Sequence, residues 1–385
     1  MQYELTPDQK LFQETIKHLA NDKIAPGAAK RDEVEKFDWN VVNLLREHDL
    51  FGIDHPAEYG GAGADLLSKA LALEEISKVD ASCSLLLAVH SVGCLPIVIG
   101  ANEDQKKRFL PKLSTGEHLA AFALTEPSAG SDVANLKCEA KRDGNFYVLN
   151  GTKNFITNGG VADIITVYAV NNGNAASHKN ASVFVVEKGF PGFSVGKKEN
   201  LMGVRWAEVV ELNFEDCRIP AENLLGTGGD GFHIMMNSLS FSRTGIAAQA
   251  VGIASGALEI AVDYAKNRAA FGKPIIEHQG IGFKLADMAM RTEAARQLLY
   301  KTCSLFKNQP KDLSRLPREL VRMSSMSKCF CSDTAMMVAT EAVQVLGGYG
   351  YTKDYPVERM MRDAKITQIY EGANELQRLT ISRNL

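Results

Sequence analysis

The residue with the clearest potential for chemistry is Glu371, which stands between Tyr370 and Gly372 near the end of the chain. The surrounding residues predict a loop that passes into a short helix over 372–383. A carboxylate there can act as a general base if its surroundings raise its pKa above the value of about 4.3 that a solvated glutamate has. It can equally be an ordinary acidic residue near a helix N-terminus, where negative charge is favoured. The motif alone leaves both interpretations open.

Three other segments have residue types suited to binding a polar ligand. FALTEPSAGSD at 122–132 predicts a strand entering a loop rich in hydroxyls, although ordinary strand-to-turn junctions look the same. RAAFGKP at 268–274, followed by Gln279, offers an arginine for phosphate beside an aromatic ring, or it is a charged helix end. QVLGGYGY at 344–351 offers glycines that a ligand can approach closely, or it is a helix C-cap. It lacks the GxGxxG spacing of a dinucleotide fingerprint.

No set of residues has the spacing of a metal site. Cys329 and Cys331 lack the paired spacing of a structural zinc site, and no histidine stands near them. We therefore interpret them as two positions of one helix. His90 stands in an apolar helical stretch, so we expect it in the core or in a cleft wall. We predict that the protein binds no metal.

Composition excludes several classes of protein. A length of 385 residues predicts two or three domains, and 45% hydrophobic with 23% charged residues indicates a folded chain. With 43 basic and 46 acidic side chains, the net charge of −3 provides no field that would attract nucleic acid. The odd number of cysteines, 7, argues against a disulfide framework and indicates a reducing setting.

The sequence also indicates no targeting segment and no membrane span. The opening residues MQYELTPDQK resemble neither a signal peptide nor a transit peptide. The longest uninterrupted apolar runs, such as 85–89, are far shorter than the roughly 18 residues of a spanning helix. We therefore expect a cytoplasmic bacterial protein.

The predicted secondary structure that positions the motifs changes twice along the chain, from helices to strands and back to helices. Up to about residue 118 the apolar residues follow helical spacing, with a helix start at Thr6-Pro7 and an N-cap at Asp38. Further helices are predicted over 65–80, 81–99 and 103–115. Strands follow, because apolar residues then alternate or cluster in short runs. They are predicted at 146–149, 164–170, 183–186 and 210–214, with Asn150-Gly151 as a tight turn.

Helical spacing returns at about residue 229 and continues to the end of the chain. Helices are predicted over 243–268, 282–306, 318–346 and 372–383, with an exposed connection at 308–317. The many small side chains in 243–268 predict that another helix approaches it closely.

Together and in this order, five passages resemble the acyl-CoA dehydrogenase family. They are LTEPSAGSD at 124–132, NGTKNFITNGG at 150–160, FEDCRIPAENLLG at 214–226, RAAFGKPIIEHQ at 268–279 and QVLGGYGYTKDYPVERMMRDAKITQIYEG at 344–372. The likeness covers essentially the whole chain, and the last passage is most similar to the short-chain, butyryl-CoA branch. The resemblance implies a multidomain fold: an all-α N-terminal domain over 1–118, a middle β-barrel or β-sandwich domain over 119–228, and a C-terminal four-helix bundle over 229–385.

The resemblance implies FAD as the cofactor, in a site shared between chains of a homotetramer that is a dimer of dimers. Residues matched to the flavin ring and its surroundings are Phe122, Leu124, Thr125, Ser131, Phe155, Thr157, Ala373 and Glu375. Residues matched to the adenine and pyrophosphate, partly on a neighbouring subunit, are Arg268, Phe271, Gln279, Gln344, Gly347 and Gly348. Residues matched to the acyl-CoA substrate are Ser131, Ser240, Arg243 and Gly372.

The resemblance also implies a reaction of fatty acid β-oxidation. Glu371 would remove the α-proton of a short-chain acyl-CoA thioester, and its backbone N–H together with a flavin ribityl hydroxyl would stabilise the developing enolate oxygen. Flavin N5 would take the β-hydride, giving a trans-2-enoyl-CoA, and the electrons would pass to an electron-transfer flavoprotein. The same groups would serve an enoyl-CoA reductase working in reverse. A dehydrogenase of cyclic or aryl-substituted acyl-CoA and a non-catalytic acyl-CoA-binding protein are further alternatives.

Several positions depart from the family pattern and bear on the acyl group. Ser242 stands where some branches have their base, which leaves Glu371 as the candidate. Ser240 replaces a frequent Asp, Trp206 replaces a small residue, and Ala373 replaces a frequent Thr. No arginine occurs in the expected cleft wall at 82–93, which disfavours a dicarboxylic acyl group.

Overall fold

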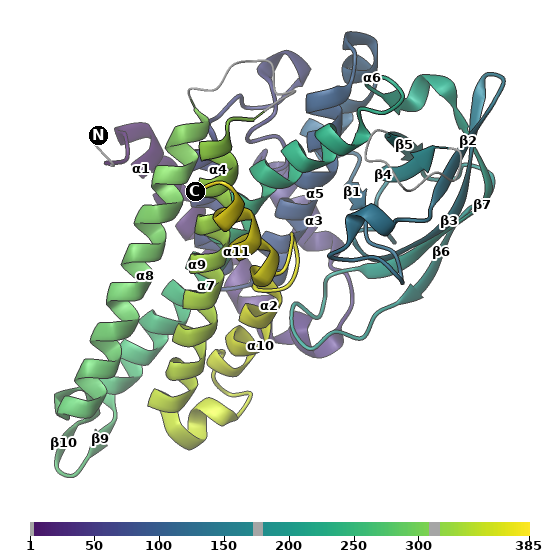
Figure 1. Cartoon of the computed structure of the whole chain (residues 1–385). Helices are drawn as coiled ribbons and strands as arrows, with labels where there is room; N and C mark the ends of the chain where they lie inside the picture. Colours follow the sequence, from purple (N-terminus) through teal and green to yellow (C-terminus); the bar gives the residue numbers. More distant parts are fainter. Residues whose placement is uncertain (1–3, 172–179, 308–315) are drawn as a thin grey trace.

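The computed structural model describes residues 4–171, 180–307 and 316–385, and most of the exposed connection predicted at 308–317 lies outside these ranges. Helices from the first and last thirds of the chain pack into one helical body, and the β-rich middle third stands at its side (Figure 1). The arrangement confirms the predicted order of helical, β-rich and helical parts.

The first third is helical, as its apolar spacing predicts. Thr6 and Gln9 form a reciprocal capping box at the first helix, and the Asp38 carboxylate accepts a hydrogen bond from the N–H of Asn40. Both predicted helix starts are therefore confirmed. The helices are α1 (Pro7–Leu19), α2 (Ala25–Val34), α3 (Trp39–Glu47), α4 (Leu66–Ser77), α5 (Ala81–Gly100) and α6 (Glu103–Ser114), with a π-helical turn at Ala20–Ile24.

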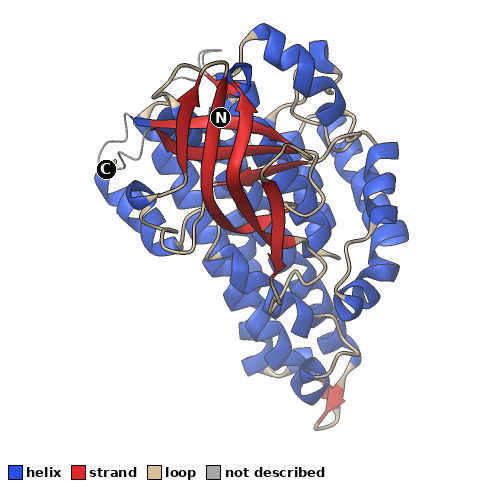
Figure 2. Cartoon of the chain, turned by 90° about the vertical axis from the view of Figure 1, so that its right-hand side faces the viewer, coloured by secondary structure: helices blue, strands red, loops and turns tan. Residues whose placement is uncertain are grey.

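The middle third forms one sheet that folds over its own core. Its strands are β1 (Ala120–Ala123), β2 (Glu139–Asp143), β3 (Phe146–Thr157), β4 (Ile164–Asn171), β5 (Ala181–Glu187), β6 (Phe193–Lys198), β7 (Val209–Pro220) and β8 (Leu224–Leu225). The strand order is β6-β7-β3-β2-β4-β5-β8, with β1 parallel to β4. Leu149 and Leu212 from one half pack in the same cluster as Val167 and Phe184 from the other. Figure 2 shows these strands in red against the helical body.

The prediction of a tight turn at Asn150-Gly151 is wrong. β3 runs through both residues and pairs with β7, with a shift of register between Leu149 and Gly151. Gly151 has a φ of 146°, and a Cβ there would lie 2.7 Å from the Cα of Cys138. The glycine therefore permits a bulge and a close approach of the chain before β2, and pairing with strands on both sides outweighs the local preference of Asn-Gly for turns.

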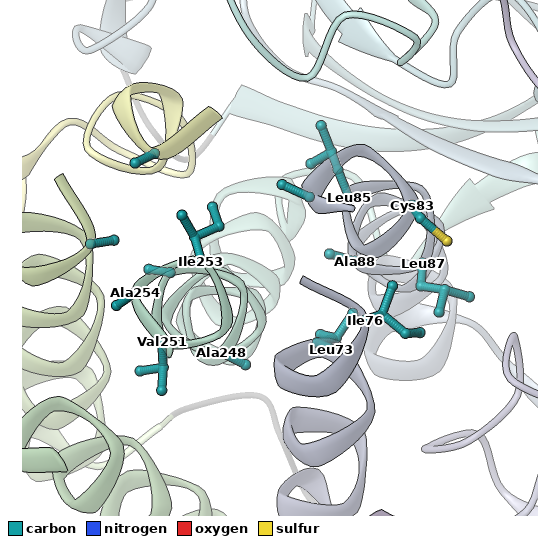
Figure 3. Packing of buried hydrophobic residues seen from close by; sticks show 14 of the residues in the cluster. Leu73, Ile76, Cys83, Leu85, Leu87, Ala88, Ala248, Val251, Ile253 and Ala254 are labelled. Carbon is teal, nitrogen blue, oxygen red and sulfur yellow. The ribbon is translucent and has the colours of Figure 1, made fainter. Parts of the chain in front are cut away.

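The last third is helical again, and the candidate base lies between its last two helices. The helices are α7 (Gly231–Asn267), α8 (Gln279–Phe306), α9 (Arg318–Leu346), α10 (Val357–Thr367) and α11 (Asn374–Arg383), with a small hairpin of β9 (Ala269–Ala270) and β10 (Lys273–Pro274) between α7 and α8. The sequence patterns did not predict α10. Small residues of α7 let α4 approach, because a Cβ on Gly252 would lie 2.3 Å from the Glu74 carbonyl oxygen. Figure 3 shows α7 facing Leu73 of α4 and Ala88 of α5.

Two helices correct the prediction that no segment is long and apolar enough to span a membrane. α5 and α7 both meet the criteria of length and composition, because their small and uncharged polar residues interrupt the apolar runs without adding charge. In each helix 78% of the apolar stretch is buried within the protein. Both helices therefore belong to the core of the packed fold. All seven cysteines are buried and free, which fits the absence of a disulfide framework.

Candidate active site

Glu371 lies in the turn between α10 and α11, in a backbone conformation that few side chains adopt. Its φ is 56°, and the next residue, Gly372, has a φ of 91°. Ser242 of α7 donates a hydrogen bond from its hydroxyl to Oε2 of Glu371 over 2.5 Å. Strained turns of this kind persist only where the surrounding contacts fix them, and they concentrate at functional sites.

The surroundings of Glu371 shift its pKa in the direction that a base requires. Burial raises the pKa of this carboxyl group above its usual range. The hydrogen bond from Ser242 and the positive charges of Arg243, Lys328 and Lys69 act in the opposite direction without cancelling the effect. A carboxylate with a raised pKa accepts a proton more readily near neutral pH.

Arg243, on α7, has an unsatisfied polar atom. The side chain is buried, and its Nη1 donates to the Ser325 hydroxyl over 3.3 Å. Its Nε has no hydrogen-bond partner in the described parts of the chain, and burial lowers the pKa of the guanidinium to about 10. Because buried donors are nearly always paired, this N–H is a candidate to donate to an acceptor on a bound ligand. Ser240, one turn earlier, instead donates its hydroxyl to the Met236 carbonyl of its own helix.

Three residues that fix the turn of Glu371 were not predicted from the sequence. Lys328 of α9 donates to the Gly372 carbonyl oxygen over 2.9 Å, and Gln377 of α11 donates to the carbonyl oxygens of Glu371 and Gly372. Asn374 receives a second hydrogen bond from Lys328. The available signal was Lys328 itself, a lysine among small residues in the middle of the helix predicted over 318–346. Lysines are almost never fully buried unless they are paired. Ala373 precedes α11 without a side-chain cap, and Glu375 is exposed in its first turn.

The loop after β1 is attached firmly to β3. Asn154 donates its N–H to the Thr125 carbonyl oxygen over 2.8 Å. Lys153, fully buried, donates to the Leu124 carbonyl oxygen and forms an ion pair with Glu126 over 2.8 Å. Glu126 in turn accepts hydrogen bonds from two backbone N–H groups, at residues 137 and 138. This ion pair was also not predicted, although both residues stand within the quoted motifs.

Six of the eight residues predicted for the flavin ring lie on β1, on this loop or on β3, whereas Ala373 and Glu375 lie at the start of α11. Phe122 is half-buried on β1, and Ser131 is exposed at the far end of the loop. Phe155 of β3 is 59% exposed with a φ of 57°, just where the register with β7 shifts, and Thr157 ends the strand. An exposed aromatic ring on a strained bulge beside a loop of hydroxyl groups suits a planar ligand.

A second group of predicted residues surrounds a cavity at the end of the helical body. The cavity has a volume of about 510 Å³, and its walls include Arg268, Gly347 and Gly348. The Arg268 guanidinium lies 5.8 Å from the ring centroid of Tyr349. A Cβ on either glycine would meet no other atom within 4 Å, so both face open space. The other three predicted residues are exposed near this end of the bundle: Phe271, Gln279 and Gln344.

One chain does not bring the two groups together. The β9–β10 hairpin, beside the cavity, projects from the end of the helical body, whereas β1 and β3 lie on its other side (Figure 1). If the cofactor site is shared between chains, as predicted, each group would meet its complement on a neighbour. The residue assignments themselves stay predictions.

The structure also brings together three potential metal ligands that the sequence analysis did not group. The side chains of His55, His90 and Cys94 are buried, and their ligand atoms lie within 4.8 Å of one another. His90 uses both ring nitrogens, since Nδ1 accepts from the Ala120 N–H and Nε2 lies 3.0 Å from the Leu113 carbonyl oxygen. The trio therefore lacks a free third ligand, and His90 is a core residue, as predicted.

Comparisons with known proteins agree along the whole chain. Three family models match: the acyl-CoA dehydrogenase N-terminal domain at 6–117, its middle domain at 121–217 and its C-terminal domain at 229–385. An acyl-CoA dehydrogenase of Bacillus subtilis is 49% identical over 382 residues, covering 99% of this chain and 98% of the relative.

Two solved structures are similar over nearly their full lengths. The butyryl-CoA dehydrogenase of Megasphaera elsdenii has a TM-score of 0.94 and 43% identity, covering 100% of this chain and 99% of its own. A chain from a study of the electron transferring flavoprotein of Acidaminococcus fermentans and flavin-based electron bifurcation has a TM-score of 0.95 and 44% identity, with coverage of 100% and 99%.

Proposed function

The chain belongs to the acyl-CoA dehydrogenase family, and we propose that it oxidises a short-chain acyl-CoA thioester to the trans-2-enoyl-CoA with Glu371 as the base. As a member of this family it is an oxidoreductase whose cofactor is FAD. The observation that carries the proposed role of Glu371 is its half-buried carboxylate, held by Ser242 on a turn with positive φ. The similarity to a butyryl-CoA dehydrogenase supports the short acyl chain.

The residues around Glu371 suit the removal of a weakly acidic proton. The α-proton of a thioester leaves only if a base receives it and the developing enolate oxygen is stabilised. Glu371 supplies the base, and its own backbone N–H, which donates to no other described residue, is available for the oxygen. Arg243 contributes a buried positive charge that acts on Glu371, and its Nε–H has no partner within the described residues.

The residues present also fit FAD, which when bound supplies the acceptor for the hydride of the β-carbon. Thr125, Phe155 and Thr157 would hold its ring end, while Arg268 with the two glycines at 347 and 348 would hold the adenine end of a cofactor shared with another chain. We propose a homotetramer on this basis, which sedimentation of the purified protein tests directly. An electron-transfer flavoprotein is the proposed electron acceptor.

The reverse reaction is a second candidate function. Glu371 and the groups around it would also return a proton to the α-carbon of an enoyl-CoA, because a proton transfer uses the same groups in both directions. The similarity to the Acidaminococcus chain, from a study of flavin-based electron bifurcation, favours this candidate. Reduction of an enoyl-CoA by NADH in the presence of a co-purified electron-transfer flavoprotein would support it.

The proposed function is tested by anaerobic reduction of the protein-bound flavin. The purified protein should be yellow, and its flavin absorbance should bleach with butyryl-CoA faster than with branched, cyclic or aryl acyl-CoA. Glu371→Gln should stay yellow and fail to bleach. Glu319→Gln, at an exposed position in the first turn of α9, is the matched control and should bleach normally. Normal bleaching by Glu371→Gln would overturn the assignment of the base.

A further inference from the structure

Building on the proposed role of Glu371 as the base, we propose that Lys328 is a positioning residue that fixes the Glu371–Gly372 turn to α9 and directs a positive charge at the Glu371 carboxylate. Lys328 does not touch the reacting atoms in this account. It acts through the turn and through its charge, and the two effects can be measured separately.

The hydrogen bonds of Lys328 are unusual for a buried lysine. The side chain is fully buried, and its acceptors in the described parts of the chain are the Gly372 carbonyl oxygen and Asn374 Oδ1, each at 2.9 Å. The other two buried lysines each have a carboxylate partner, Asp54 for Lys69 and a glutamate for Lys153. Burying a charge without a counter-ion costs several kcal/mol. Lys328 has no carboxylate within ion-pair distance in the described chain, so the through-space charges of Glu371 and Asp333 are the ones that offset it.

The turn depends on Lys328 because its two carbonyl oxygens have few other partners. Gln377 Nε2 donates to the Glu371 oxygen over 3.2 Å and to the Gly372 oxygen over 2.9 Å, and Lys328 supplies the second bond to Gly372. Asn374 then links the turn to Ser332 and to the Cys329 carbonyl oxygen of α9. Two consecutive residues with positive φ are held by these contacts, so their loss should let the Glu371 side chain leave its position.

The charge of Lys328 acts on Glu371 together with charges from other elements. Arg243 of α7 and Lys69 of α4 also face the carboxylate, and Tyr370 is the adjacent titratable group. Lys328 is itself faced by Cys329, Asp333, Glu371 and Arg243, and burial lowers its pKa to about 8. It is therefore charged near neutral pH and favours the ionised form of Glu371 there.

Two nearly isosteric substitutions separate the positioning effect from the charge. Lys328→Met removes a donor and a charge, whereas Gln377→Met removes the donors and an acceptor oxygen without a partner in the described chain, but no charge. The rate of anaerobic flavin bleaching with butyryl-CoA is measured across about pH 5.5 to 7.5, where Lys328 is charged. We expect both variants to bleach at least about tenfold more slowly at saturating substrate. Only Lys328→Met should shift the rising limb of the pH profile, by about half a unit or more to higher pH, because losing a cation raises the pKa of Glu371.

Controls make the outcomes distinguishable. Thermal unfolding and flavin content establish that each variant is folded and loaded, and Lys328→Gln, which is neutral but retains an N–H donor, replaces Lys328→Met if that variant does not fold. An unchanged rate and pH profile in the neutral Lys328 variant, with Glu371→Gln inactive, would overturn the positioning role and leave the proposed function standing. An equal shift of the pH profile in Gln377→Met would overturn the role of the charge. Bleaching by Glu371→Gln would instead overturn the proposed function itself.

Discussion

Two loops of the candidate site are each held by a buried lysine, and the two lysines differ in how their charge is balanced. Lys153 fixes the loop after β1 and is neutralised by Glu126 in an ion pair. Lys328 fixes the turn of Glu371 and bonds only to neutral oxygens in the described chain. A purely structural clamp pairs its charge, since an unpaired buried charge destabilises the fold. Lys328, next to the candidate base, has no such ion pair in the described chain, so its charge can act on the Glu371 carboxylate.

The largest effect that distinguishes the two regions is expected from Lys153→Met. This substitution leaves Glu126 as a buried carboxylate without its partner. The free energy of unfolding should therefore fall by about 3–5 kcal/mol, and bound flavin should be lost. Urea unfolding and the flavin-to-protein absorbance ratio measure these effects. The double variant Lys153→Met with Glu126→Gln should recover part of the stability. Unchanged stability and flavin content in the single variant would show that the ion pair does not hold the loop.

A smaller effect is expected in the pH dependence of stability around Lys328. The folded pKa of about 8 is below the unfolded value, so the unfolded chain binds more protons above pH 8. The contribution of Lys328 to the free energy of unfolding therefore rises with pH from about 8 to about 10.4, by at most about 1.4 kcal/mol per pH unit. Urea unfolding of the wild type and of Lys328→Met at both ends of this range measures the difference. A difference that stays constant with pH would contradict an unpaired buried charge.

The smallest effect is expected from Ser242→Ala. The hydroxyl of Ser242 favours the ionised form of Glu371, so its removal should raise the pKa of Glu371 and move the rising limb of the pH–rate profile by up to about one unit to higher pH. The plateau rate should change by less than about threefold, because the turn keeps its backbone contacts. Ser238→Ala, whose hydroxyl donates within the same helix, is the matched control. A profile identical to that of the control would contradict this role.

The sequence predicted the order of the elements, because the spacing of apolar residues is local and regular. The residues assigned to FAD were implied by the family resemblance and stay predictions. The apolar spacing did not predict α10, in which buried positions include the charged residues Arg359 and Asp363. These two side chains bond to the carbonyl oxygen of Val79 and the N–H of Val204, so distant segments satisfy polar groups that obscure the apolar stripe of the helix.

The contacts that hold the site were the hardest to predict, because they also join residues that are far apart in the sequence. Lys328 and Gly372 are separated by 44 residues, and Lys153 and Glu126 by 27. No local pattern indicates which polar groups such a lysine will meet. Glu371 could be identified as a candidate from its motif, but the cause of its raised pKa is the packing of α7, α9 and the turn around it.

The exchange of the α-proton of a bound acyl-CoA with solvent deuterium tests the central claim most directly, because it reports proton removal separately from hydride transfer. Under anaerobic conditions in D2O, the wild-type protein should introduce deuterium at the α-carbon of butyryl-CoA, as measured by mass spectrometry. Glu371→Gln should introduce none above the background of the thioester alone, while still binding FAD. Exchange at the wild-type rate in Glu371→Gln would contradict the account, because another group would then be the base.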